Sequence, residues 1–217
     1  MSHRRPPLIA ALMLNSLVLV VELITGITGH SLSLIMDGVH NLSDEIALAF
    51  LVSAYTLRTG ISGRLLQTAN LFNSVGLLAV CGLLGWQVFE RLITPVEVVG
   101  ILPIAAGLIG AVGNWGVARV LRHASREDAA IRLAYVHNLT DVLVSLTPVI
   151  AGVLIISFGN FIFDPIGAFV ILAVIIVGTV RTIMDSHKEL IWPENVSCGH
   201  SQSSEAVRQS IAESGTQ

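Results

Sequence analysis

Two short runs of the sequence place a histidine and an aspartate four residues apart within apolar surroundings. The first run is His40-Asn-Leu-Ser-Asp44, and the second is His137-Asn-Leu-Thr-Asp141. Residues four apart lie on the same face of an α-helix, one turn from each other. Each run therefore offers one imidazole nitrogen and one carboxylate oxygen in the same direction. Two such helices brought together would supply two nitrogens and two oxygens, a ligand set suited to tetrahedral zinc.

The same four ligands would also accept cobalt or cadmium. Selection among these ions would depend on the geometry of the site rather than on raw affinity. The absence of a thiol disfavours copper(I), and the two imidazoles disfavour magnesium and calcium. Two other interpretations stay open. Each His–Asp pair could be an ion pair that holds two helices together, or part of a proton relay. The duplication of the run favours a shared metal site.

The composition indicates which elements must position these side chains. Of the 217 residues, 53% are hydrophobic and only 12% are charged, whereas about a quarter of the residues in soluble domains are charged. Mean hydropathy is +0.77, so most of the surface must face something other than water. A formal net charge of −3 argues against a nucleic-acid partner.

Six segments are long and apolar enough to be helices across a lipid bilayer, which requires about 20 residues each. The predicted spans are residues 8–28, 32–57, 69–93, 97–121, 130–158 and 163–184. We therefore expect an all-α polytopic membrane protein. Residues 1–185 would form a six-helix transmembrane domain, and residues 186–217 a short, polar and disordered cytoplasmic tail.

The basic residues are divided unequally between the two sides that these spans define. One side holds only Arg91, and the other side holds Arg4, Arg5, Arg58, Arg64, Arg119, Arg122, Arg126, Arg132, Arg181, Lys188 and Arg208. Because short cytoplasmic segments are enriched in arginine and lysine, this distribution predicts that both termini are cytoplasmic. A bacterial inner membrane is the simplest expectation.

Further polar residues lie within the predicted spans, where ionisable groups are costly. Asp37 is expected either to accept a hydrogen bond that orients His40 or to carry protons. Glu22 is expected to line a cavity. Asn73 and Asn114 could do the same, but interhelical hydrogen bonds are the favoured interpretation. Asp164, followed by proline, is typical of a helix start.

Together these motifs resemble the zinc-type branch of the cation diffusion facilitator family. The resemblance rests on residues 22–26, 31–44, 137–141 and 164–166, and on Glu90-Arg91-Leu92 followed by Pro95. It implies export of zinc, or of cadmium or cobalt, from the cytoplasm in exchange for protons. It also implies a homodimer in the lipid bilayer, with no cofactor. By position, the ligands of the transported ion would be His40, Asp44, His137 and Asp141.

Two other functional classes are alternatives to transport. A zinc hydrolase needs an open coordination position and a general base, commonly in a His-Glu-x-x-His helix, and the sequence has no such helix. We therefore expect no enzymatic activity. The family's usual cytoplasmic metal-binding domain is not expected within residues 186–217. A membrane metal sensor or scaffold that does not transport is thus the alternative to efflux.

Overall fold

The computed structural model describes residues 5–56, 63–127 and 129–186. These residues form long helices and one short 3₁₀ turn, with no strand among them. The elements are α1 (Arg5–Thr28), α2 (Leu32–Thr56), α3 (Gly63–Ile93), α4 (Ile101–Leu121), η2 (Ala124–Arg126), α5 (Ala129–Phe158) and α6 (Phe163–Ser186). The prediction of an all-α polytopic membrane protein is confirmed. The predicted tail, apart from Ser186, lies outside the described residues.

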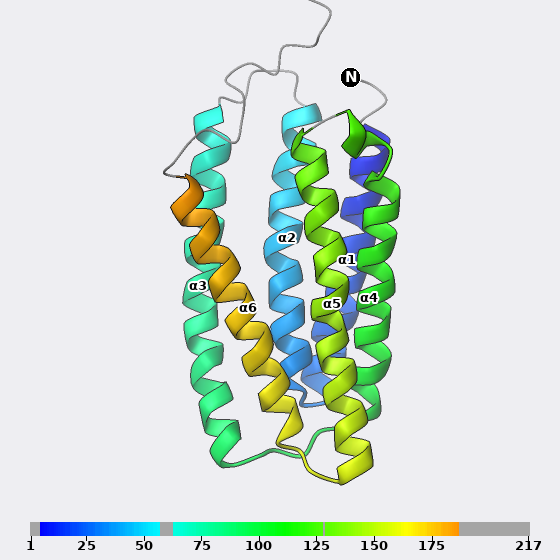
Figure 1. Ribbon diagram of the computed structural model, residues 1–217, viewed down its shortest axis with the longest axis vertical. Coiled ribbons are helices and arrows are strands. Elements are labelled where there is room, and N and C mark those ends of the chain that lie inside the picture. Colours follow the sequence, from blue (N-terminus) through cyan, green and yellow to red (C-terminus); the bar gives the residue numbers. More distant parts are fainter. Residues whose placement is uncertain (1–4, 57–62, 128, 187–217) are drawn as a thin grey trace, which may run out of the picture.

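The helices run roughly parallel to one long axis and form two groups (Figure 1). Helices α1, α2, α4 and α5 pack as a four-helix group, and α3 and α6 lie side by side at its edge. Helix α2 contacts each of the other five helices. It is therefore the central helix of the bundle.

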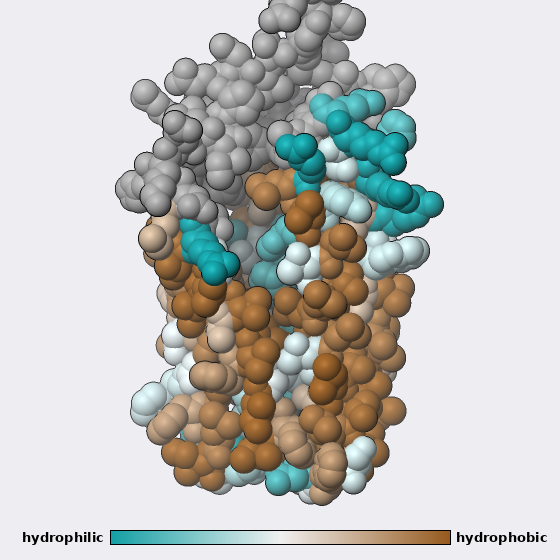
Figure 2. All heavy atoms as spheres, in the orientation of Figure 1, coloured by the Kyte–Doolittle hydropathy of each residue, from teal (hydrophilic) through white to brown (hydrophobic). Residues whose placement is uncertain are grey.

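Five of the described helices are long and apolar enough to cross a membrane, and α2 is the exception. The reason is its sequence, which includes Asp37, His40, Asp44 and Glu45. Its central position shields these groups from lipid, so an internal helix tolerates a polarity that a peripheral helix would not. The sides of the bundle are predominantly hydrophobic, as Figure 2 shows for one face.

The fourth predicted span begins too early, because α4 starts at Ile101 rather than at residue 97. The residues before it form an irregular connection from α3. Within this connection, the Val99 backbone N–H donates to the Gly29 carbonyl in the turn between α1 and α2 (3.2 Å). The hydrophobic pattern continues through the connection, so it did not reveal where the helix begins.

Glycines allow α4 to approach its neighbours closely. A Cβ atom at Gly110 would lie 2.1 Å from a Glu22 carboxylate oxygen on α1, and one at Gly113 would lie 2.1 Å from the Val18 side chain. On α5, a Cβ at Gly152 would lie 2.6 Å from the Gly100 carbonyl oxygen. Small residues commonly permit such contact between membrane helices. As a result, the Glu22 carboxylate is completely buried between helices.

Asp164 joins α6 to the first turn of α2. Its carboxylate accepts hydrogen bonds from the backbone N–H groups of Leu32 (2.6 Å) and Ser33 (3.2 Å). It also accepts hydrogen bonds from the hydroxyls of Ser31 and Ser33, both at 2.7 Å. An aspartate at a helix N-terminus satisfies donors that have no partner within the helix. Asp164 was predicted to mark the start of its own helix, and it also caps a different one.

Candidate metal centre

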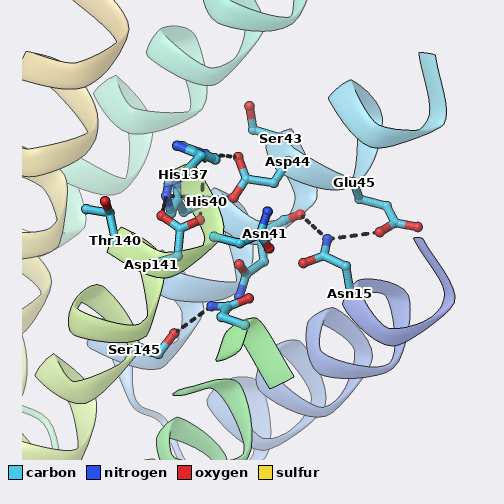
Figure 3. A network of polar contacts seen from close by, with 12 residues as sticks. Asn15, His40, Asn41, Ser43, Asp44, Glu45, His137, Thr140, Asp141 and Ser145 are labelled. Carbon is cyan, nitrogen blue, oxygen red and sulfur yellow. Dashed lines mark hydrogen bonds and ion pairs between the residues drawn. The ribbon is translucent and has the colours of Figure 1, made fainter. Parts of the chain in front are cut away.

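The structure brings the two His-x-x-x-Asp runs together. His40 and Asp44 lie one turn apart on α2, and His137 and Asp141 lie one turn apart on α5 (Figure 3). One ligand atom from each residue can be chosen so that all four lie within 4.8 Å of one another. No other group of three or more potential metal-ligating His, Cys, Asp or Glu residues occurs in the described parts of the chain.

The histidines and aspartates face each other crosswise between the two helices. His40 Nε2 lies 3.2 Å from Asp141 Oδ1, and His137 Nε2 lies 2.8 Å from Asp44 Oδ1. The distances within each helix are longer: His40 Nε2 to Asp44 Oδ2 and His137 Nε2 to Asp141 Oδ2 are both 3.7 Å. Each histidine therefore has one aspartate from each helix near the same nitrogen.

These separations match those needed around a small tetrahedral ion. Zinc–nitrogen and zinc–oxygen bonds of about 2.0–2.1 Å place neighbouring ligand atoms roughly 3.3 Å apart. The four nitrogen–oxygen distances between 2.8 and 3.7 Å lie on both sides of this value. Asp44 Oδ2 and Asp141 Oδ2 have no hydrogen-bond partner within the described residues, although both atoms are buried. Carboxylate lone pairs are therefore free to bind a cation.

The two histidines differ in their exposure. The His40 side chain is 11% exposed, whereas the His137 side chain is 47% exposed. On α5, Leu133 and Val136 before His137 and Leu143 after it are also exposed, whereas Ile131 is buried. Val144 and Ser145, which follow the site, are buried. The site is thus more open beside His137 than beside His40.

A hydrophobic cluster closes the other half of the bundle, between the site and the end near Asp164. It includes Leu32 and Met36 of α2, residues of α3 and α6, and Val144 of α5. Apolar side chains from four helices are packed together there. A second hydrophobic cluster, which includes Leu51 of α2, Leu121 of α4 and Ile131 of α5, packs toward the opposite end. The metal centre therefore lies between two layers of packed apolar side chains.

Residues that the sequence analysis did not single out hold the α2 side of the site in place. The Asn41 side-chain amide donates to the Glu22 carboxylate on α1, and the Asn15 amide donates to the Asn41 carbonyl (3.2 Å) and to Glu45 (2.9 Å). Ser16 also donates to Glu45. Two features of the sequence could have indicated these residues. Glu45 directly follows Asp44, and Asn15 and Glu22 are seven residues apart, which puts both on one face of α1.

The predicted supporting residues have different surroundings. Asn73 on α3 donates to the Ser43 carbonyl and hydroxyl on α2 (3.1 and 3.0 Å), and Asn114 on α4 donates to the Ser145 hydroxyl on α5 (3.2 Å). Both asparagines thus form interhelical hydrogen bonds. Asp37 is fully buried, and neither of its carboxylate oxygens has a hydrogen-bond partner among the described residues.

The expected hydrogen bond from His40 to Asp37 is therefore not formed in this structure. His40 Nδ1 is buried and also lacks a partner within the described residues. Both groups lie on α2, three residues apart, and the His40 ring directs Nε2 toward Asp141 instead. A helix fixes which face two side chains share, but it does not determine the rotation of the imidazole ring.

The fold and the site together define a class of protein: a membrane-spanning helical bundle with a His/Asp cluster among its helices. The family model described as the cation efflux transmembrane domain matches residues 8–191. This chain therefore belongs to the cation efflux family.

Curated relatives are similar over most of this chain. The zinc transporter ZitB of Escherichia coli is 31% identical over 182 residues, which is 80% of this chain and 58% of the relative. The cadmium, cobalt and zinc/H(+)-K(+) antiporter of Bacillus subtilis is 27% identical over 207 residues, covering 90% of this chain and 66% of the relative. The metal cation efflux system protein CzcD of Cupriavidus metallidurans is 29% identical over 156 residues, covering 68% of this chain and 49% of the relative. The chain thus spans less than two thirds of the length of these relatives.

Proposed function

We propose that this protein moves a divalent transition-metal ion out of the cytoplasm, and that His40, Asp44, His137 and Asp141 bind the ion during transport. The observation that carries the proposal is the crosswise arrangement of two imidazoles and two carboxylates contributed by α2 and α5. Binding at this position would place the ion between two helices. A site shared by two helices suits a transporter, because relative movement of the helices changes the ligand geometry.

Zinc is the first candidate for the transported ion, followed by cadmium and cobalt. Two nitrogen and two oxygen ligands at tetrahedral separations suit zinc, and the other two ions accept similar ligands. The printed names of the relatives include zinc, cadmium and cobalt. The ion is cargo in this proposal, and no cofactor is invoked.

Exchange for protons follows from the chemistry of the ligands. Imidazole must be neutral and carboxylate ionised to bind a metal, so binding releases protons and release of the metal allows protons to return. Histidine titrates near physiological pH. The name of the Bacillus subtilis relative also includes protons. Metal affinity is therefore expected to fall as the pH is lowered, because protons compete for all four ligands.

The greater exposure of His137 supports an inward-facing arrangement, in which the ion enters from the end where α5 begins. That end carries Arg119, Arg122 and Arg126, and enrichment of basic residues favours the cytoplasmic side. We accordingly propose a bacterial inner-membrane protein with both termini in the cytoplasm. Residues 1–185 would be the transport domain. We also propose a homodimer, which analytical ultracentrifugation in detergent would test.

A transporter is favoured over the two alternative classes. Four protein ligands leave no open tetrahedral position for a substrate, as a hydrolytic zinc site requires. A scaffold has no need to bury two His–Asp pairs among membrane-spanning helices, where ionisable groups are costly. It is nevertheless the alternative that the following experiment must distinguish.

The test is zinc flux into or out of reconstituted vesicles under an imposed pH gradient. We expect gradient-driven flux in the wild-type protein and its loss in both Asp44→Ala and Asp141→Ala. Glu97→Ala is the matched control, because this exposed carboxylate precedes α4 and is remote in sequence from the site. Zinc binding without flux in the wild-type protein would contradict the transport proposal and favour a sensor. Full proton-coupled flux in Asp44→Asn would contradict the proposed ligand set.

A further inference from the structure

A hollow of about 170 Å³ lies in the groove between α4 and α5, outside the metal centre. It is lined by Trp115, Ala118, Arg119, Arg122, Tyr135 and Leu139. Trp115, Arg119 and Arg122 are spaced by four and three residues along α4 and its C-terminal cap, so they form one stripe. Tyr135 and Leu139 are one turn apart on α5 and complete the opposite wall.

The polar side chains of this lining are nearly all hydrogen-bond donors. Arg119 and Arg122 contribute two permanent positive charges, and Trp115 and Tyr135 contribute an indole N–H and a phenol. None of the described residues that line the hollow is acidic. Neither guanidinium pairs with another residue in the described parts of the chain, and both arginines are exposed. The hollow therefore presents an excess of donors and positive charge without an acceptor to balance it.

The position of the hollow along the bundle restricts what it can bind. Arg119 and Arg122 lie at the end of α4, where hydrophilic side chains gather over the upper ends of α4 and α5 in Figure 2. Trp115, one turn closer to the bilayer centre, is 55% exposed, and Leu139 is 45% exposed. Tryptophan and tyrosine are enriched at membrane–water interfaces. The hollow thus joins a cationic upper wall to an apolar lower wall at the level of lipid headgroups.

We infer that this hollow binds the headgroup of an anionic phospholipid. The phosphodiester would lie between the guanidiniums of Arg119 and Arg122, which can donate two hydrogen bonds each to phosphate. The acyl chains would run over Trp115 and Leu139 toward the bilayer centre. Basic pockets between transmembrane helices on the cytoplasmic side are suited to such headgroups. This inference requires the protein to lie in a membrane, but it does not depend on metal transport.

The site adjoins the metal centre through α5. Tyr135 and Leu139 flank His137 at a distance of two residues on either side. They lie on a different face of the helix from His137, because two residues correspond to about 200° of rotation. A lipid in the hollow would therefore contact the outer face of the helix segment that carries His137, without contacting the metal ligands.

Native mass spectrometry of the detergent-purified protein, titrated with phosphatidylglycerol or phosphatidylcholine, tests the inference. We expect preferential retention of phosphatidylglycerol by the wild-type protein. The double variant Arg119→Gln/Arg122→Gln should weaken that binding by roughly 25-fold, or about fivefold for each arginine at a membrane surface. The matched control is Arg126→Gln/Arg181→Gln, which removes the same charge from exposed arginines outside the hollow.

The control variant distinguishes a specific headgroup site from a general attraction of anionic lipid to basic residues. An equal loss of phosphatidylglycerol binding in both double variants would overturn the inference, as would equal retention of the two lipids by the wild-type protein. Competition by free glycerol phosphate at the same concentration as the lipid would also overturn it, since this would indicate a site for soluble anions. A second variant, Trp115→Ala, keeps both charges and should weaken binding of long-chain but not short-chain phosphatidylglycerol. Circular dichroism and size-exclusion chromatography, measured in parallel, verify that each variant is folded.

Discussion

The same five-residue pattern occurs on α2 and on α5, but the two copies have different surroundings. On α2, Asn41 donates to Glu22 of α1, which links the pattern to a neighbouring helix. On α5, the corresponding Asn138 donates to the Ala134 carbonyl of its own helix (2.9 Å). His40 is largely buried, whereas nearly half of the His137 side chain is exposed.

Two copies of the same motif can therefore offer the same nitrogen and oxygen atoms while neighbouring helices hold them differently. The α2 copy lies on the central helix of the bundle, which contacts every other helix. The α5 copy lies at the open edge of the site. We therefore expect the ligands of the two helices to be equivalent in metal binding, but not in stability or accessibility.

The largest expected effect is on metal affinity, where the two copies should behave alike. Asp44→Asn and Asp141→Asn should each weaken zinc binding by at least about 100-fold, since even residues that only orient metal ligands contribute 10- to 100-fold. Isothermal titration calorimetry of the purified proteins measures the effect, with Glu97→Gln as control. Near-normal affinity in one variant and loss in the other would show that the ion is held mainly by one helix.

A smaller effect, on stability, should distinguish the copies. Asn41→Leu leaves the buried Glu22 carboxylate without its donor, and an unsatisfied buried group costs about 1–3 kcal/mol. Asn138→Leu removes a hydrogen bond to a carbonyl of the same helix, so its cost should be below about 1 kcal/mol. The free energy of unfolding, measured by denaturant titration in mixed micelles, gives both values. Equal costs would mean that the α1–α2 link does not stabilise the fold.

The smallest expected effect is on reaction rates with a water-soluble thiol reagent. Single cysteines at position 40 or 137, made as His40→Cys and His137→Cys in a chain with Cys81→Ala and Cys198→Ser, report access to the site. We expect labelling at position 137 to be about tenfold faster, because accessibility governs thiol modification together with thiolate formation. Comparable rates, measured by mass shift over time, would contradict an arrangement open on the α5 side.

Much of the fold could be predicted from the sequence because membrane spans are long and apolar. The breaks at residues 29–31 and 159–162 separate helices clearly, and a left-handed residue occurs in each: His30 (φ 54°) and Gly159 (φ 65°). The helix starts were less predictable. Residues 95–99 are nearly as apolar as the helix that follows, so hydropathy could not locate Ile101 as the first residue of α4.

The pairing of helices was harder to predict than their existence. In lipid, a helix can be apolar on all sides, so hydrophobic periodicity does not reveal its buried face. The four proposed ligands could be singled out because they form a repeated pattern. The link from Asn15 to Glu45 joins residues that are 30 positions apart, and its detection requires the rotation of α1 relative to α2. The attachment of Asp164 to Leu32, over 132 positions, has no local signal at all.

The hydrogen bond from Leu32 to Asp164 anchors one end of α2, so a tilt of the helix would displace residues far from that end the most. Asp164 holds its first turn at one end of the bundle, with Arg91 within 3.9 Å of the same carboxylate. Asp44 lies twelve residues along the helix from Leu32, which corresponds to about 18 Å at 1.5 Å per residue. A tilt of about 10° around the fixed end would therefore displace Asp44 by roughly 3 Å. This displacement is comparable with the distances between the His and Asp atoms of the site. A small tilt of α2 would therefore be enough to separate these atoms from each other.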